Sequence, residues 1–114
     1  MSENTPFGLT VVFELNPGKH EKFLKFMSEV SAYVKEHEPY VWTYELTMAR
    51  SNPKGEPDIA IMREVYENKA GFDMHVASDK LKDFLKTHAK ENFTKKTTFY
   101  HMDLSQTTGF TSKL

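Results

Sequence analysis

Apolar and polar residues alternate over residues 7–15, FGLTVVFEL, and again over residues 41–49, VWTYELTMA. A period of two places alternate side chains on one face of an extended chain, so each stretch predicts a β-strand with one apolar face. The predicted apolar faces consist of Phe7, Leu9, Val11, Phe13 and Leu15 in the first strand, and of Trp42, Tyr44, Leu46 and Met48 in the second.

Between these strands the apolar period becomes that of a helix. Asn16-Pro17-Gly18 interrupts the first strand, and apolar residues then recur at spacings of three and four from about residue 19 to residue 36. Pro39 ends this predicted helix, because the residue before a proline is displaced from helical geometry. The apolar stripe consists of Phe23, Met27, Val30 and Val34, widened by Phe26 and Tyr33.

The second half of the chain predicts two more strands and two helices. Residues 51–57 are rich in turn residues, residues 58–66 predict a third strand, and residues 69–77 predict a short helix. Ser78 or Asp79 can cap a further helix. The apolar stripe of that helix consists of Leu81, Phe84, Leu85 and His88. A final strand near residues 96–102 precedes a polar C-terminal tail, residues 103–114, which has no periodicity.

The predicted order β-α-β-β-α-α-β indicates an α+β, ferredoxin-like antiparallel sheet with helices on one face. We expect a single domain over residues 1–114, with its core at about residues 7–102. A sheet covered on one side carries polar residues on the other. Here the second face is predicted to hold Val12, Val41, Phe99 and one alternating set from residues 59–62. This half-apolar face predicts a homodimer, in which two sheets pack together as a dimeric α+β barrel.

Composition and charge narrow the classes of function. The 15 Lys and Arg nearly balance the 16 Asp and Glu, so no overall field indicates nucleic acid or a membrane as a partner. The chain has no cysteine, which excludes disulfides and thiol chemistry. With no signal-peptide pattern and no apolar stretch of about 20 residues, a cytoplasmic protein is expected. Nine Phe, five Tyr, six Met and one Trp can pack a core or line a pocket for a flat ligand.

His75 is the residue on which a functional hypothesis depends. It lies in the predicted helix of residues 69–77, beside Phe72, and the sequence offers it no obvious partner. An imidazole has an unperturbed pKa of about 6.5, which suits proton transfer near neutral pH, although a well-packed core histidine is the alternative. No two of the five histidines are three or four residues apart, so no metal site is expected.

Three segments, taken in order, resemble the antibiotic biosynthesis monooxygenase (ABM) domain. They are VVFELNPG followed by an amphipathic helix, then EPYVWTYEL, and then REVYENKAGFDMHVASDKLKDF. The similarity covers residues 11–84 and the final strand, which is most of the chain. The positions that match the pattern are Glu38, Tyr44, Glu64, Tyr66, Glu67, Asn68, Ala70, His75, Ser78 and Phe84.

The resemblance implies a ligand pocket between the sheet and the helices, beside His75. Relatives of this fold include cofactor-independent monooxygenases of quinols and polyketide phenols. In such chemistry a base removes a proton, and the electron-rich anion then reacts with oxygen without metal or flavin. We therefore expect no cofactor, and we expect His75 and Glu64 to be catalytic. The expected substrate-binding residues are Tyr66, Trp42, Tyr44, Phe72 and Phe84.

Two alternatives to an oxygenase stay open from the sequence. One is a dimer that binds a small aromatic or apolar molecule without converting it, and the other is an isomerase that uses His75 as acid and base. Haem degradation, found in other relatives, fits poorly. The strand VVFEL has no asparagine, His75 stands where a tryptophan is expected, and Leu85 stands where a histidine is expected.

Overall fold

One antiparallel sheet of four strands, in the order β2-β3-β1-β4, forms the centre of the computed structural model, which describes residues 4–112. Residues 1–3, and residues 113–114 of the predicted tail, lie outside the described residues. The elements are β1 (Phe7–Leu15), α1 (His20–His37), β2 (Val41–Ala49), β3 (Ile59–Tyr66), α2 (Lys69–Ala77), α3 (Asp79–Glu91) and β4 (Thr94–Met102). The predicted α+β, ferredoxin-like order is confirmed.

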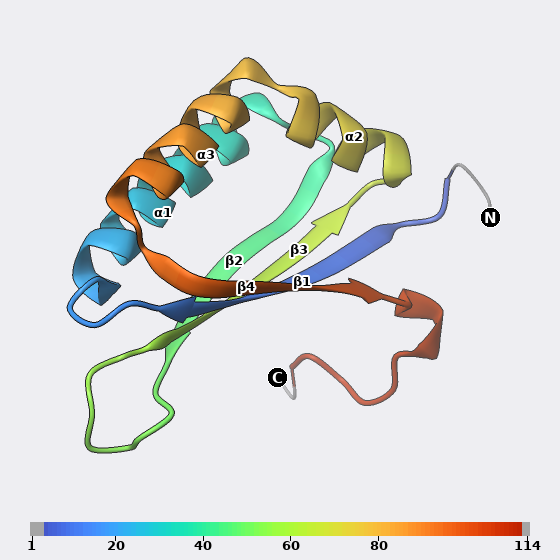
Figure 1. The fold of residues 1–114 in the computed structure, drawn as a ribbon. Helices are drawn as coiled ribbons and strands as arrows, with labels where there is room; N and C mark the ends of the chain where they lie inside the picture. Colours follow the sequence, from blue (N-terminus) through green and yellow to red (C-terminus); the bar gives the residue numbers. More distant parts are fainter. Residues whose placement is uncertain (1–3, 113–114) are drawn as a thin grey trace.

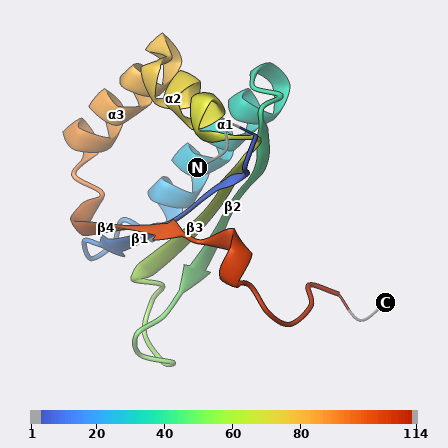
Figure 2. The same cartoon turned by 90° about the vertical axis from the view of Figure 1, so that its right-hand side faces the viewer.

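All three helices lie on one side of the sheet, and the other side is open (Figures 1 and 2). Helix α1 places its predicted stripe against the sheet, where Phe23, Met27, Val30 and Val34 are all buried. Opposite them the inner residues of β1 and β3 are buried as alternation requires, including Val11 and Met62. Helix α3 differs, because none of its residues is buried and it stands away from the sheet (Figure 2).

The predicted apolar face of β2 was wrong at one position. The pairing of β2 with β3 shifts register between Val41 and Thr43. Such a shift inserts an extra residue and changes which side the following side chains face. Val41 and Tyr44 both pack against the core, whereas Trp42 is 58% exposed. Trp42 therefore does not share a face with Tyr44, and Val41 does not belong to the second face of the sheet.

The second face of the sheet is half apolar, but its residues differ in part from those predicted. Phe99 is paired with Val11, whose side chain is buried in the core, and Phe99 accordingly faces the helices. The paired residues Val12 and Ile61 do lie on the open face. The open face also holds Val65 and, from the edge strand β4, Tyr100 and Met102, which are about half exposed.

The C-terminal tail begins against one end of this open face. A short 3₁₀ helix, η1 (Leu104–Gln106), follows β4 and is capped by Asp103, whose Oδ1 accepts from the Ser105 amide at 3.1 Å. A Cβ on Gly8 would lie 3.0 Å from Leu104 Cδ2, so glycine at this position lets Leu104 pack on β1. The tail then leaves the body of the protein, and Phe110 is 78% exposed (Figures 1 and 2).

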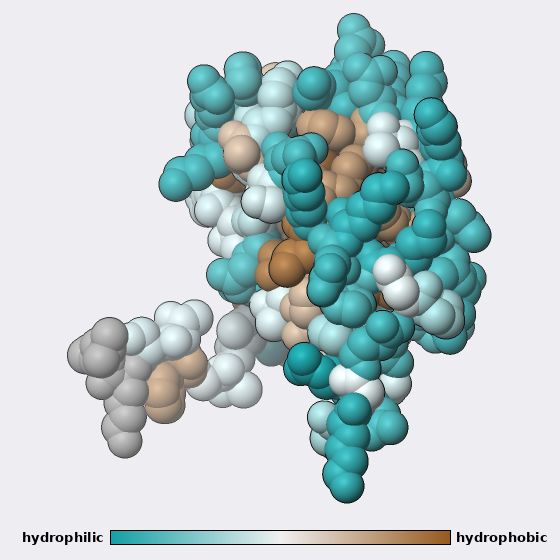
Figure 3. All heavy atoms as spheres, turned by 90° about the vertical axis from the view of Figure 1, so that its left-hand side faces the viewer, coloured by the Kyte–Doolittle hydropathy of each residue, from teal (hydrophilic) through white to brown (hydrophobic). Residues whose placement is uncertain are grey.

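The side of the molecule shown in Figure 3 is largely hydrophilic. Seen from the side shown in Figure 3, hydrophilic residues surround an apolar area, and the tail stands apart from the rest of the molecule. Among residues 4–112, no helix combines the length and the apolar content needed to span a membrane.

Candidate functional site

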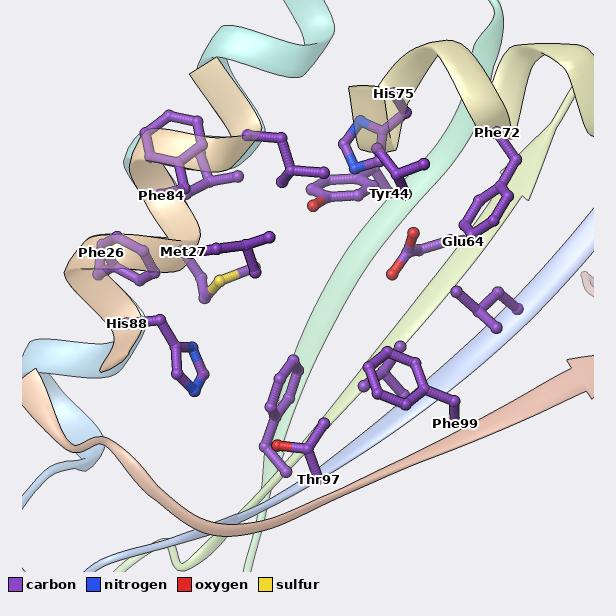
Figure 4. Close-up of a pocket in the computed structure, with 17 residues that line it drawn as sticks. Phe26, Met27, Tyr44, Glu64, Phe72, His75, Phe84, His88, Thr97 and Phe99 are labelled. Carbon is purple, nitrogen blue, oxygen red and sulfur yellow. The ribbon is translucent and has the colours of Figure 1, made fainter. Parts of the chain in front are cut away.

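A cavity of about 420 Å³ lies between the sheet and the helices (Figure 4). This volume is within the range of about 300–1,000 Å³ that is common for small-molecule sites. Its walls are mostly aromatic and aliphatic side chains from β1, β4 and all three helices. The polar side chains among its lining residues are Tyr44, Glu64, His75, His88 and Thr97.

His75 reaches the cavity from α2 and is held from behind by a carboxylate. His75 is 3% exposed, and its Nδ1 lies 2.6 Å from Oε1 of Glu38, which is 4% exposed. An ionised carboxylate can only accept, so Nδ1 donates the proton in this hydrogen bond. The opposite ring nitrogen, Nε2, is then the atom available for proton exchange with a ligand.

The Glu38–His75 contact forms because the turn after α1 and the start of α2 lie close together. Glu38 follows the last turn of α1, and α2 is capped by Asn68, whose side-chain oxygen accepts from the Gly71 amide at 2.9 Å. Gly71 packs directly on Tyr40, since a Cβ at position 71 would lie 3.2 Å from the Tyr40 Cβ. Glycine at this position therefore allows α2 to lie against the turn that carries Glu38.

Glu64 is the second buried carboxyl group at this end of the cavity. It is 7% exposed on β3, and its Oε1 accepts a hydrogen bond of 2.5 Å from the hydroxyl of the fully buried Tyr66. Burial raises the pKa of Glu64, while the Tyr66 hydrogen bond and the nearby His75 oppose this shift. The net elevation favours the neutral carboxylic acid, which can donate a proton.

Aromatic rings surround these polar groups. Tyr44 packs edge-on against the His75 ring at 5.4 Å between centroids, and Tyr66 lies 5.5 Å from the same ring. Burial, followed by the charge of Glu64, raises the pKa of both tyrosines, so each stays a phenol and a hydrogen-bond donor. Phe72 lies 5.3 Å from Tyr66 and 4.7 Å from Phe7, which closes this end of the cavity.

The structure brings together five of the seven site residues predicted from the sequence. His75, Glu64, Tyr44, Phe72 and Phe84 all line the cavity. Tyr66 lies behind Glu64 as its hydrogen-bond donor and is not among the lining residues.

Trp42 does not line this cavity. It lies in a separate groove between α1 and β2, because the bulge at residues 41–43 turns its side chain away from the ligand site. The structure therefore does not bring Trp42 together with the other predicted site residues.

Glu38 and His88 contribute to the site, but the sequence analysis did not predict either as a site residue. Glu38 belongs to the ABM-like pattern, but its contact with His75 spans 37 positions of the chain and leaves no local signal. His88 was expected only as part of an apolar helical stripe. It lies in the cavity wall with Nε2 at 3.1 Å from the Thr94 hydroxyl. Among residues 4–112, no group of three His, Asp or Glu side chains is arranged to hold a metal ion.

Comparisons with known proteins bear on the fold. A scan of protein-family models and a search of curated proteins both find no match. A solved structure named "putative antibiotic biosynthesis monooxygenase" from Caulobacter crescentus matches with a TM-score of 0.74 at 21% identity, over 89% of this chain and 91% of that chain. One of the same name from Bacteroides thetaiotaomicron has a TM-score of 0.78 at 14% identity, over 98% and 100% of the two chains.

A third match is a conserved protein from Methanosarcina mazei, with a TM-score of 0.72 at 18% identity over 88% of this chain and 93% of that chain. These TM-scores establish a shared fold. Because the identities are low, the reaction has to be argued from the site. The fold that the sequence resemblance implied, that of ABM-like proteins, is therefore confirmed.

Glu64→Gln is expected to remove a pH-dependent loss of stability. Because the pKa of Glu64 is raised above 4.5, the folded protein keeps a proton that the unfolded chain has already released. The stabilisation of the folded state by the protonated Glu64 is complete below pH 4.5, and it is lost as the pH rises through the folded-state pKa of Glu64. Glutamine has no proton to lose and retains an oxygen that can accept from Tyr66.

Urea unfolding of both proteins between about pH 4 and about pH 8 measures this effect. The free energy of unfolding of the variant, minus that of the wild type, should increase as the pH rises through the folded-state pKa of Glu64. A difference that stays constant or decreases would show that burial does not raise this pKa.

Proposed function

We propose that this protein is a cofactor-independent monooxygenase whose substrate is a small electron-rich aromatic of the quinol or phenol type. One observation carries the proposal: a buried histidine, held by a buried glutamate, faces a cavity whose walls are mostly apolar. Two proteins of the same fold have names of this enzyme class, which supports the reaction type. In this proposal His75 and Glu64 are the catalytic residues, and Glu38 positions His75.

The reaction would begin with removal of a proton. Ground-state oxygen reacts poorly with closed-shell molecules, whereas a phenolate is electron-rich enough to transfer one electron to it. Nε2 of His75 would accept the proton of the substrate hydroxyl. Glu38 would stabilise the imidazolium that forms, as a carboxylate does when it is hydrogen-bonded to a catalytic histidine. The apolar walls would keep water from the reacting anion.

Atoms and electrons balance without an external reductant. Recombination of the phenoxyl and superoxide radicals forms a carbon–oxygen bond, and the imidazolium protonates the resulting peroxide. Cleavage of the oxygen–oxygen bond releases one oxygen atom as water, and loss of the ring C–H proton leaves a carbonyl group. The substrate supplies all four electrons that reduce the oxygen molecule to the carbonyl oxygen and water. Glu64 would protonate the departing oxygen and regain the C–H proton, a role consistent with its raised pKa.

The remaining predicted residues have roles that differ in kind. Tyr44, Phe72 and Phe84 line the cavity and would contact the rings of the substrate. Tyr66 would act through Glu64, because its hydroxyl donates to that carboxyl group.

A second candidate function, a proton-transfer isomerase, has one observation in its favour. His75 and Glu64 line the same cavity and provide a base and an acid for moving a proton on a bound ligand. Such a reaction consumes no oxygen, so an oxygen measurement separates the two candidates.

We also propose the homodimer that the sequence predicts. Its support is the open sheet face, although Val41 and Phe99 no longer contribute to it. Val12 and Ile61 lie side by side near the centre of that face. Packing two copies of the face about a two-fold axis would remove these side chains from water and build a barrel-like core. The absence of cysteine fits the cytoplasmic location that we propose for the protein.

Oxygen consumption by the metal-stripped protein tests the proposed reaction, with a panel of quinols and phenols as substrates. We expect uptake that falls at least about 100-fold in His75→Ala, since general bases contribute about 10²–10⁴ to such rates. The matched control is His37→Ala, because His37 is exposed at the end of α1 and contacts Tyr33 instead of the cavity. Equal uptake in wild type and His75→Ala would rule out this mechanism. Ligand binding without uptake would support a binding protein, and anaerobic conversion would support the isomerase.

Light scattering tests the dimer. At micromolar concentration we expect a mass of twice 13.2 kDa for the wild type. Ile61→Glu should give the single-chain mass, because a two-fold axis would bring two carboxylates into an apolar interface. Leu24→Glu, at an exposed apolar position on α1, is the matched control and should leave the mass unchanged. A wild-type protein with the mass of one chain would contradict the dimer.

A further inference from the structure

The cavity contains a second histidine whose surroundings differ from those of His75. His88 projects from α3 into the part of the cavity above β4, whereas His75 projects from α2 near Glu64 (Figure 4). The rings that pack on His88 are those of Phe13, Phe23, Phe26 and Phe93. The rings that pack on His75 are those of Tyr44 and Tyr66. The two sets share no member, and Figure 4 shows the two histidines in separate parts of the cavity.

One nitrogen of His88 is engaged and the other is available. Nε2 lies 3.1 Å from the Thr94 hydroxyl, which anchors the ring to the start of β4. Thr97 lines the same part of the cavity and lies next to Thr94, with 3.5 Å between the two hydroxyl oxygens. Among residues 4–112, Nδ1 of His88 has no hydrogen-bond partner, and it is not enclosed by protein atoms. This nitrogen therefore offers a polar contact in an aromatic wall.

The chemistry of this end suits an uncharged oxygen. Burial lowers the pKa of His88, which keeps the imidazole neutral near neutral pH. The Thr94 hydroxyl can either donate or accept, so the tautomer of His88 can adapt. Nδ1 can then accept from a ligand hydroxyl or donate to a ligand carbonyl. The four phenylalanine rings offer no counter-charge to an ionised group.

We propose that His88 anchors a hydroxyl or carbonyl group at the end of the ligand opposite to the group deprotonated by His75. The preferred ligand is then an elongated molecule of two or more fused rings with an oxygen substituent at each end, and a single-ring phenol fills only part of the site. A cavity of about 420 Å³, with Phe26, Met27 and Phe99 among its walls, accommodates such a flat body. This inference rests on the proposed function in that both place an aromatic ligand in this cavity.

Anaerobic binding of matched fluorescent probes tests the inference without turnover. The pairs are 2-naphthol with 2,6-dihydroxynaphthalene, and 2-hydroxyanthracene with 2,6-dihydroxyanthracene. Within each pair only the hydroxyl at the far end differs. We expect the wild type to bind the diol of at least one pair about five- to tenfold more tightly, the gain typical of one added hydrogen bond.

Replacing His88 should remove this preference for the diol without weakening the binding of the monohydroxy probe. In His88→Phe, which continues the aromatic wall, the diol and its partner should bind with affinities within about twofold of each other. Affinity for the monohydroxy probe should be retained. His88→Leu provides a second variant should the phenylalanine prevent folding, and His37→Phe, at an exposed position, is the control that keeps the preference.

Three results would overturn the inference: equal affinities within both pairs in the wild type, a preference that persists in a folded variant without His88, or binding of no probe. The last result would also overturn the proposed aromatic substrate. A diol preference that depends on His88, combined with no oxygen uptake on any quinol or phenol, would instead overturn the oxygenase alone.

Discussion

The buried pair of Glu38 and His75 is the interaction on which the site depends. Glu38 and His75 are each less than 5% exposed, so their carboxylate and imidazole would be costly to bury separately, and the hydrogen bond of 2.6 Å between them offsets that cost. The pair also joins the end of α1 to α2, two elements that are far apart in the chain. The contact of Gly71 with Tyr40 allows the two elements to approach. Removing Glu38 would leave the buried imidazole unpaired and its direction undefined. Removing His75 would leave the buried carboxylate unpaired.

The distribution of polarity explains how this pair could serve a reaction. Glu64 and Tyr44 share its end of the cavity, His88 and Thr97 supply the polar groups beside β4, and the walls between are apolar. The open position of α3, which has no buried residue, leaves this space beneath it unfilled by side chains. If α3 packed closely against the sheet, its side chains would fill this space, and the same order of elements would enclose an ordinary core without a cavity. The cavity therefore follows from how one helix is placed over the sheet.

Most of the fold could be predicted from the sequence because its signals are local. Alternation gave β1 and β2 with their observed ends, and a stripe at helical spacing gave the four buried residues of α1. The errors arose where a side chain's direction depends on a partner strand, as with the bulge that exposes Trp42 and the pairing that turns Phe99 toward the helices. In the site, His75 could be found from its place on an apolar helix face. Glu38 could not be assigned as its partner, because only the tertiary fold brings residues 38 and 75 together.

The central claim is that Glu38 holds His75 with its Nδ1 proton toward the carboxylate and its Nε2 toward the cavity. Nitrogen-15 NMR of the histidine rings measures this directly, because it distinguishes a protonated from an unprotonated ring nitrogen. For the wild type we predict a hydrogen-bonded Nδ1–H of His75, with a signal that changes in Glu38→Gln while the signals of His88 do not. A His75 ring whose Nδ1 carries no proton, or whose signals are the same in Glu38→Gln, would contradict the account.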